Sequence, residues 1–366
     1  MKKIMFFINT LDGGGAERVL VDLLNCMDTD SYEIDLITVT QGINKKFLTD
    51  KINYYPIIKT NNKVINNLLK KIVYHIPKRL FSLLFMRKKY DIEVAYLEGF
   101  PTSVIGARRN NAKKIAFIHF DVSKGNILSS YYKDKQGCLN EYGRFSRVCF
   151  VSNQSKIGFE KTIGKLDNAC VVHNVLDYKE IKKRSLEKVD IEYSTNGLKL
   201  LSIGRLAKQK GYGRLIKILA ELEKRYEFEL FIVGEGPERS YLETLIEKYQ
   251  IKSVRLIGYM QNPYPFMKKA DIFVCSSIFE GYSTVVTEAT SLGLPVITTD
   301  CAGMDEILGN GQYGLIVPNT DNDLKNGLIR LLEDETVLKE LKVLAQKRSE
   351  MLNSDIAIEE YVELFE

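Results

Sequence analysis

A chain of 366 residues is long for a single hydrophobic core, so two domains are expected. Apolar residues make up 45% and charged residues 27%, as in ordinary globular proteins, and the apolar runs are too short to span a membrane. The net charge of +5 is uneven, since residues 1–180 carry net +10 and residues 181–366 carry net −5. The first half is therefore expected to meet an anionic partner, such as a membrane surface or a phosphorylated acceptor.

The cysteine and histidine content indicates the compartment and argues against a metalloenzyme. The six cysteines show no C-x-x-C spacing and several lie in apolar strand patterns, which favours reduced, buried thiols over disulfides or zinc. The three histidines form no metal-ligand cluster in the sequence, and we predict no metal site. The apolar run after Lys2 and Lys3 is too short for a signal peptide, so a cytoplasmic protein is predicted.

Strand-like runs alternate with helical patterns along the whole chain, which indicates parallel α/β sheets. The first half opens with a strand over 3–9, a loop containing Gly14 and Gly15, and a helix over 16–27. The glycines permit close approach of a ligand to backbone N–H groups at the helix start. A dinucleotide-binding dehydrogenase is the rival interpretation, but its G-x-G-x-x-G pattern needs a third glycine near Arg18, and none is present. Further strands of this half are predicted at 33–40, 52–57, 92–96, 115–119, 148–152 and 170–173.

The stretch 63–89 combines a positive charge with an apolar stripe. It holds eight Lys or Arg residues and no acidic residue. Before Pro77, its apolar residues recur at helical spacing: Val64, Ile65, Leu68, Leu69, Ile72, Val73 and Ile76. A basic amphipathic helix of this kind can lie on an anionic leaflet. The alternative is a helix whose stripe packs on the sheet while its lysines are solvated.

The second half starts at residue 198 and follows a polar, charged run over 179–197 that is typical of a linker. Its strands are predicted at 198–203, 229–233, 254–257, 272–275, 295–298 and 314–317. The residues 234–237 form a strand-to-helix turn with proline at the helix start. The tail from 334 to 366 is predicted to be helical.

One stretch, 276–289, holds two carboxylates eight positions apart, Glu280 and Glu288. Each can accept hydrogen bonds from vicinal hydroxyls, Glu288 from a ribose and Glu280 from a second polyol. Two glutamates at a fixed spacing also arise by chance, as one solvated residue and one on a helix face.

A helix is predicted to begin next to these carboxylates. Apolar residues recur at helical spacing after Gly281, so the helix should start near Tyr282, with Ser283 and Thr284 in its first turn. Its free N–H groups would point into a loop at the carboxyl end of a strand, which is where ligands bind in open α/β sheets.

Upstream, an apolar strand ends in Gly204-Arg205-Leu206, and Lys210-Gly211 follows four residues later. Together with the Glu280–Glu288 spacing, this pattern resembles the G-R-L…K-G loop and E-x7-E motif of the retaining glycosyltransferases of family 4. The sequence Gly-Gly-Ala-Glu-Arg-Val at 14–19 also resembles the amino-terminal signature of that family. The segment 173–177 resembles its P-N-G-V-D segment only in degenerate form.

The resemblance implies an α/β fold of the GT-B type, in which two Rossmann-like domains with parallel sheets face a central cleft. The first domain would span 1–180, with a last helix near 350–366 packing back on it. The second, the nucleotide-sugar donor domain, would span 190–349.

The resemblance also implies roles for individual residues. Arg205 and Lys210 would stabilise the departing diphosphate in place of a metal, Glu280 would orient the donor sugar, and His119 would reach that sugar from the end of its strand. A satisfied histidine at a strand terminus is the alternative for His119. The donor-binding residues would be Gly14, Gly15, Gly204, Glu235, Gly258, Tyr259, Gly281, Tyr282, Ser283, Thr284 and Glu288.

The resemblance therefore implies a cytoplasmic hexosyltransferase that can also lie at the inner face of the membrane as a peripheral protein. It would move a sugar from a nucleotide sugar, with UDP preferred, to a lipid-linked or growing surface polysaccharide such as capsule. No cofactor and no nucleic acid partner are expected. Two alternatives stay open: a nucleotide-sugar epimerase on the same fold, and a non-catalytic nucleotide-sugar-binding partner subunit.

Overall fold

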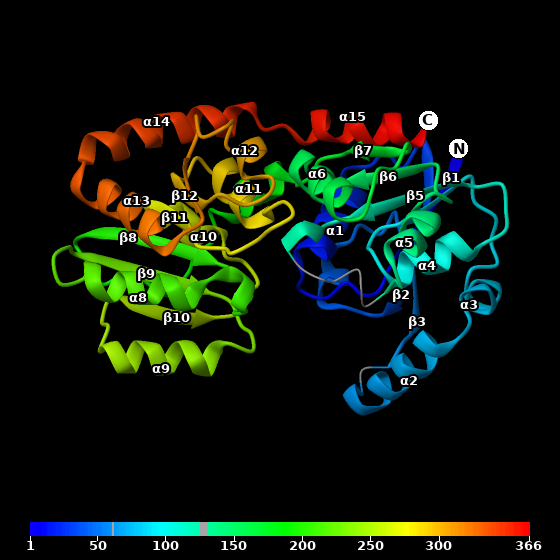
Figure 1. Cartoon of the computed structure of the whole chain (residues 1–366), viewed down its shortest axis with the longest axis horizontal. Helices are drawn as coiled ribbons and strands as arrows, with labels where there is room; N and C mark the ends of the chain where they lie inside the picture. The colour runs from blue at the N-terminus through cyan, green and yellow to red at the C-terminus, as the bar shows by residue number, and fades with distance from the viewer. Residues whose placement is uncertain (61, 125–130) are drawn as a thin grey trace. The chain divides into compact units, whose positions relative to one another are not determined.

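The computed structural model describes residues 1–60, 62–124 and 131–366, and it divides the chain into two compact units. The first unit comprises Met1–Asp177 together with Ser354–Glu366, and the second comprises Tyr178–Asn353 (Figure 1). Each unit is an α/β domain with its own parallel sheet and its own hydrophobic core. We therefore describe each unit by itself.

Over its described residues, the first unit contains one seven-stranded parallel sheet in the order β3-β2-β1-β4-β5-β6-β7. The strands near the centre of the sheet are buried and mostly apolar because helices cover the sheet on its faces, although β2 contains Asp35 and β4 contains Glu93. Their bounds are β1 Lys2–Ile8, β2 Tyr32–Thr40, β3 Asn53–Ile58, β4 Ile92–Ala95, β5 Lys113–Ile118, β6 Arg147–Phe150 and β7 Ala169–Val171. The helices are α1 Gly15–Cys26, α2 Lys63–His75, α3 Lys78–Phe85, α4 Phe100–Ala107, α5 Lys135–Tyr142, α6 Asn153–Thr162 and α15 Ser354–Phe365.

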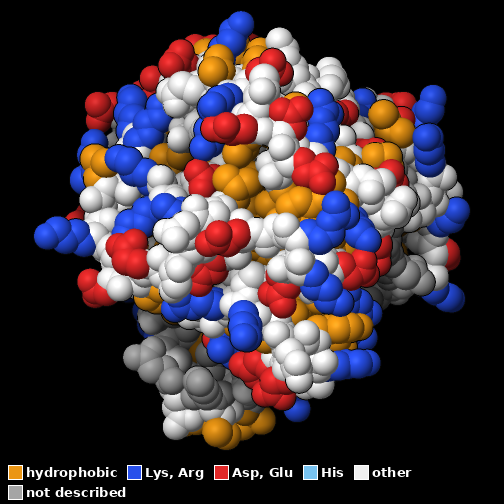
Figure 2. All heavy atoms as spheres, turned by 90° about the vertical axis from the view of Figure 1, so that its left-hand side faces the viewer, with side chains coloured by type: hydrophobic (Ala, Val, Ile, Leu, Met, Phe, Trp, Pro, Cys, Tyr) orange, Lys and Arg blue, Asp and Glu red, His pale blue; other side chains and the backbone are white. Residues whose placement is uncertain are grey.

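The second unit is described throughout and contains a six-stranded parallel sheet in the order β10-β9-β8-β11-β12-β13. Its strands are β8 Leu198–Ile203, β9 Phe228–Val233, β10 Val254–Gly258, β11 Ile272–Cys275, β12 Val296–Thr299 and β13 Leu315–Val317. Its helices are α7 Tyr178–Arg184, α8 Tyr212–Leu222, α9 Arg239–Tyr249, α10 Tyr264–Lys269, α11 Thr284–Ser291, α12 Met304–Ile307, α13 Asp321–Glu333 and α14 Glu335–Met351. Acidic and basic side chains are interspersed over the face of this unit in Figure 2.

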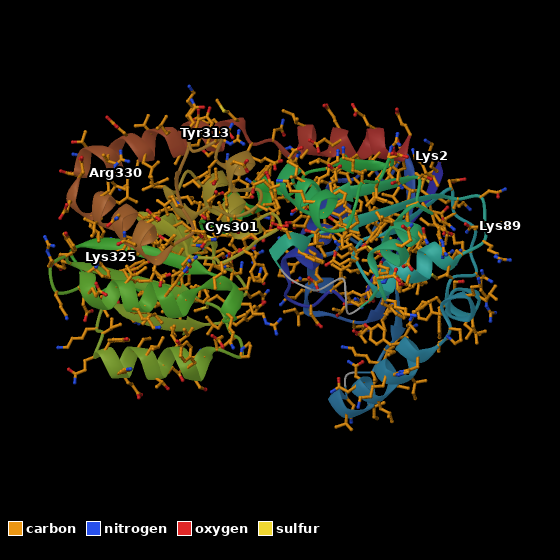
Figure 3. The ribbon with its side chains drawn as sticks, viewed as in Figure 1. Lys2, Lys89, Cys301, Tyr313, Lys325 and Arg330 are labelled. Carbon is orange, nitrogen blue, oxygen red and sulfur yellow. The ribbon has the colours of Figure 1, made fainter. Side chains whose placement is uncertain are left out.

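The last helix, α15, belongs to the first unit although it follows the second in sequence. Tyr361 stacks on Phe117 of β5 with ring centroids 5.7 Å apart, and Phe365 meets Phe6 of β1 edge to face. Lys2 lies beside the end of α15, where its Nζ donates to the Phe365 carbonyl at 3.2 Å (Figure 3). The final residues of the chain thus complete the core of its first unit.

The prediction of a linker over 179–197 is wrong. Helix α7 opens the second unit and packs against α10 and α11. Farther on, Tyr193 stacks on Phe231 of β9 at 3.9 Å between ring centroids. The segment is charged on average, but its few apolar residues, including the buried Ile181, attach it to the second unit.

Four of the six cysteines, Cys138, Cys149, Cys275 and Cys301, are buried, and the described part of the chain contains no disulfide. No described helix is both long enough and apolar enough to cross a bilayer.

Candidate active site

The second sheet brings most of the predicted site residues to one edge. Its strand order reverses between β8 and β11, and ligands of doubly wound sheets bind at the carboxyl ends of the strands at such a switch point. Gly204, Arg205 and Lys210 follow β8, and the stretch with Glu280 follows β11. The two motifs, far apart in sequence, therefore come from adjacent strands.

Lys210 and Glu280 form a partly buried ion pair at this switch point. The Lys210 Nζ lies 2.7 Å from Glu280 Oε1, and Ser277 Oγ donates to the same oxygen at 2.6 Å. Glu280 is only 7% exposed. Burial opposes the charged form of Lys210, but the Glu280 carboxylate outweighs it and holds the pKa of the ammonium above its ordinary value. The Lys210 ammonium is therefore charged, and the two side chains hold each other in place.

Hydrogen bonds interlock the two loops that carry this pair. The Ile278 N–H donates to the Gln209 carbonyl at 2.7 Å, and Ser276 Oγ donates to the Lys210 carbonyl at 2.9 Å. Arg214 of α8 binds the carbonyls of both Ser276 and Ser277 at 2.7 Å. Because these bonds do not depend on a ligand, the loops are preorganised.

Helix α11 begins beside the pair, two residues later than predicted. Ser283 is its N-cap residue, but no side-chain capping bond forms, and its buried Oγ has no hydrogen-bond partner among the described residues. Gly281, Tyr282 and Thr284 complete this turn. The start of α11 thus offers a hydroxyl and N–H groups to a bound anion.

Glu288 lies farther along α11 and is 6% exposed. Tyr264 of α10 donates its hydroxyl to Glu288 Oε1 at 2.9 Å. The carboxylate is therefore oriented by a neighbouring helix.

A cysteine contacts the loop that carries Glu280. Cys301 lies in the interior of the unit, and its thiol donates to the Ser277 carbonyl at 3.3 Å (Figure 3).

Arg205 differs from Lys210, although the sequence presents them as a pair. Its side chain is exposed. An exposed guanidinium can adjust to a ligand, whereas the Lys210 ammonium is held by Glu280.

Three of the predicted donor-binding residues, Glu235, Gly258 and Tyr259, follow the two outer strands on this side of the sheet. Glu235 comes after β9, is exposed and pairs with Arg239 at 2.5 Å. Gly258 ends β10, and the Tyr259 side chain is 55% exposed. These residues lie at the same edge as Lys210 because all four strands are parallel.

The remaining predicted residues, Gly14, Gly15 and His119, belong to the first unit, at the carboxyl ends of β1 and β5. His119 packs on the Tyr96 ring at 4.9 Å between centroids. Burial lowers the pKa of its imidazole to about 4, so the ring is neutral at pH 7. Its Nε2 is buried without a hydrogen-bond partner among the described residues.

Glu98 is a candidate that the sequence reasoning missed. It follows β4, which borders β1 at the switch point of the first sheet, and its Oε2 accepts the His119 N–H at 3.3 Å. Burial raises the pKa of its carboxyl to about 7, and the nearby Glu17 adds to the shift. No residue spacing in the sequence marks Glu98 as a site residue. Only the strand order shows that it lies beside His119.

Two Asp-x-Asp triplets occur in the chain, a spacing at which two carboxylates can hold a metal ion. Asp28 accepts the Asp30 N–H in a turn before β2, and Asp323 pairs with Thr320 at the start of α13. Among the described residues, no group of three or more His, Cys, Asp or Glu is placed to hold one metal ion.

Comparison with known proteins links this geometry to one group of enzymes. The model of the family described as "Glycosyl transferases group 1" matches residues 183–349. The chain is 30% identical over 322 residues to an uncharacterized glycosyltransferase of Methanocaldococcus jannaschii, covering 83% of this chain and 82% of that protein.

A second relative has a named substrate. The chain is 27% identical over 360 residues to N-acetylgalactosamine-N,N'-diacetylbacillosaminyl-diphospho-undecaprenol 4-alpha-N-acetylgalactosaminyltransferase of Campylobacter jejuni, covering 95% of each. Among solved structures, HepE of Anabaena in complex with UDP and glucose is similar with a TM-score of 0.74. It shares 20% identity over 100% of this chain and 99% of HepE, a likeness that shows the fold.

Proposed function

The chain belongs to the group 1 glycosyltransferases and has their GT-B fold, and we propose that it is a retaining, family-4-type hexosyltransferase that uses a UDP-sugar. The observation that carries the proposal is the partly buried Lys210–Glu280 pair at the switch point of the second sheet, beside the start of α11. It is supported by the UDP bound to HepE.

In the proposed reaction, the bond between the sugar anomeric carbon and the β-phosphate oxygen breaks, an acceptor hydroxyl oxygen bonds to that carbon, and the hydroxyl proton passes to the departing diphosphate. The departing diphosphate gains negative charge. Arg205, Lys210 and the N–H groups at the start of α11 would stabilise it without a metal. Because Lys210 is already fixed by Glu280, its charge needs no reorganisation during the reaction.

The two carboxylates serve the hydroxyls of the donor. Glu288 would accept hydrogen bonds from the ribose, in the orientation that Tyr264 imposes. Glu280 has one oxygen occupied by Lys210 and Ser277, and its second oxygen would accept a donor-sugar hydroxyl. In the first unit, His119, Gly14 and Gly15 would act in the transfer.

The acceptor is proposed to be lipid-linked or a growing surface polysaccharide, met at the cytoplasmic face of the membrane. The support is the Campylobacter jejuni relative, whose name specifies an acceptor on diphospho-undecaprenol. Family membership does not favour an epimerase. A non-catalytic binding subunit would hold the nucleotide sugar but release no UDP.

Two assays test the proposal. Thermal shifts with UDP-, GDP- and ADP-sugars should show the largest stabilisation with a UDP-sugar, because a ligand that binds only the native state raises apparent stability. UDP release should then continue in EDTA. Absence of UDP release with every donor would overturn the enzymatic function. Loss of release in EDTA, restored by magnesium or manganese, would overturn the metal-free diphosphate site.

A further inference from the structure

A cavity of about 410 Å³ opens on the first unit at the amino-terminal end of β5. Arg79 of α3, Arg108 and Arg109 after α4, Lys114 of β5 and Arg144 after α5 line it, and we call it the basic cavity. It lies at the sheet edge opposite the carboxyl ends of the strands, so it is separate from the site described above.

The cations of the basic cavity are poorly neutralised. Arg108 Nε donates to Glu93 Oε1 at 2.8 Å. Among the described residues, this is the one ion pair formed by the five cationic side chains that line the cavity. Arg79, Arg109 and Arg144 are exposed. Burial, with Arg108 and Arg144 nearby, lowers the pKa of the Lys114 ammonium, although Glu93 opposes the shift. Glu141 lies near Arg144, but burial raises the pKa of its carboxyl. The cavity therefore suits an anionic ligand.

Helix α3 runs along this cavity. Arg79 in its first turn lines the cavity, and Arg108 Nη1 donates to the Met86 carbonyl at its end, at 2.8 Å. The same helix exposes four large apolar side chains, with exposed fractions of 47%, 69%, 43% and 36% for Leu80, Leu83, Leu84 and Phe85.

Helix α2 has two apolar faces. Val73 is buried, and Leu69 and Ile76 pack on the core of the unit, as expected of a helix that covers a sheet. A second set remains exposed, at 78%, 48%, 59% and 55% for Val64, Ile65, Leu68 and Ile72. A helix that only covers a sheet needs a single apolar stripe. In Figure 1, α2 and α3 lie at the outer edge of the unit.

We call the exposed apolar residues of α2 and α3 the docking face. Positive charge accompanies it, since 63–89 contains no acidic residue. Two of the eight cations are engaged elsewhere: Lys88 pairs with Glu33 and Asp35, and Lys78 lies over the Phe100 ring. The Lys63 side chain lies outside the described part of the structure. Lys70, Lys71, Arg79, Arg87 and Lys89 are the cations left to meet a partner.

We propose that the docking face enters an anionic phospholipid leaflet and that the basic cavity binds the phosphate of a lipid headgroup. Apolar side chains beside unneutralised cations match the acyl chains and phosphates of such a leaflet. A free phosphate would leave the apolar face unexplained. The proposal goes beyond the transfer reaction, because it concerns where the enzyme binds and not what it transfers.

Vesicle co-sedimentation tests this with the full chain and no donor or acceptor. Wild type should bind vesicles of phosphatidylglycerol mixed with phosphatidylcholine, bind phosphatidylcholine alone weakly, and dissociate as salt rises. The cavity variant Arg109→Gln/Arg144→Gln and the face variant Leu68→Ser/Leu83→Ser should each bind about tenfold less tightly or worse. The control Lys248→Gln/Lys252→Gln, with equal charge loss on the second unit, should bind as wild type does.

Equal binding of the cavity variant and the control would overturn the headgroup site, and equal binding of the face variant and wild type would overturn the docking face. If inorganic phosphate stabilises wild type but not the cavity variant, and wild type does not bind vesicles, the cavity binds a soluble phosphate and not a lipid headgroup. UDP release by the cavity variant in detergent should match wild type, so failure of docking is distinguishable from failure of the proposed transfer.

Discussion

At the scale of single residues, Lys210 and Arg205 would divide one electrostatic task in the proposed reaction. Lys210 is half-buried and bonded to Glu280, so its position is set before any ligand arrives. Arg205 is exposed, and its side chain would follow the diphosphate as it departs. Substituting them should therefore have different consequences for folding, although both should lower turnover.

Arg205→Ala should lower kcat by roughly 100-fold, the loss typical of removing one hydrogen-bond donor to a departing anion, with an unchanged urea midpoint. Lys210→Ala should lower kcat as well and also destabilise the second unit by about 3 kcal/mol, because it leaves the Glu280 carboxylate buried without its cation. Urea unfolding and UDP release measure the two effects. Lys208→Ala, in the same loop and exposed, is the control. A Lys210→Ala protein as stable as wild type would contradict the structural role of the pair.

Glu98 should make stability depend on pH. Its pKa of about 7 in the folded state is higher than in the unfolded chain, so its contribution to stability is complete below about pH 4.5 and is lost as pH rises through 7. Between pH 5 and 8, wild type should lose on the order of 1 kcal/mol relative to Glu98→Gln, after allowance for partial exposure. Asp167→Asn, at an exposed site of the same unit, should show no such trend. A difference between Glu98→Gln and wild type that is constant with pH would rule out the raised pKa.

Some of these residues could be predicted from the sequence and others could not. Glu280 and Glu288 stand at a recognisable spacing, and Arg205 and Lys210 follow a glycine turn. Their partners carry no such signal, since Tyr264 reaches Glu288 from another helix and Ser277 is an ordinary loop serine. Direct contacts between side chains depend on packing that a one-dimensional pattern does not contain.

At the scale of elements, the site depends on how closely two loops approach. Gly211 ends the short 3-10 helix Lys208–Lys210 in a left-handed conformation, with φ of 66°. A Cβ at this position would lie 2.1 Å from the Ser276 carbonyl oxygen. Gly211 therefore permits both the turn and the contact that brings Lys210 to Glu280.

Gly211→Ala should separate these loops. The free energy of unfolding should fall by a few kcal/mol, and turnover should fall as well. Gly311→Ala is a matched control, because Gly311 also has a positive φ, of 84°, but a Cβ there meets nothing nearer than 3.9 Å. It should cost about 1 kcal/mol and leave turnover unchanged. Equal effects of the two substitutions would show that backbone conformation alone, and not loop contact, matters at Gly211.

The sequence pattern predicts some helices and strands of this chain better than others. The sequence predicts the central strand 198–203 with its observed bounds, because its mostly apolar residues lie between a polar segment and the glycine turn at Gly204. The stripe on α2 was predicted too, but its division into a packed face and an exposed face required the structure. The segment 179–197 was misjudged because average composition hid Tyr193 and Ile181.

At the scale of the whole molecule, the chain leaves the first unit at Asp177 and returns to it at Ser354. Ser354 Oγ donates to the Leu176 carbonyl at 2.8 Å, and Tyr361 is fully buried against Phe117. The first unit is therefore incomplete until the last residues of the chain are present.

Tyr361→Ala should destabilise the first unit by about 3 to 5 kcal/mol, the usual cost of truncating a buried aromatic side chain, and leave the second unit nearly unchanged. Hydrogen exchange can follow the two units separately. Ile356→Ala on the same helix is the control, since Ile356 is 60% exposed. Equal loss of protection in both units would contradict their description as separate compact bodies.

We propose that the second unit binds the nucleotide of a sugar donor through Arg205 and Glu288. Calorimetric titration of the chain with UDP in EDTA measures this directly. We predict binding by wild type and a loss of about tenfold or more in affinity for Arg205→Ala and for Glu288→Gln, because each removes a hydrogen bond to a charged group. Failure of wild type to bind UDP, or equal affinities of the three proteins, would contradict the account.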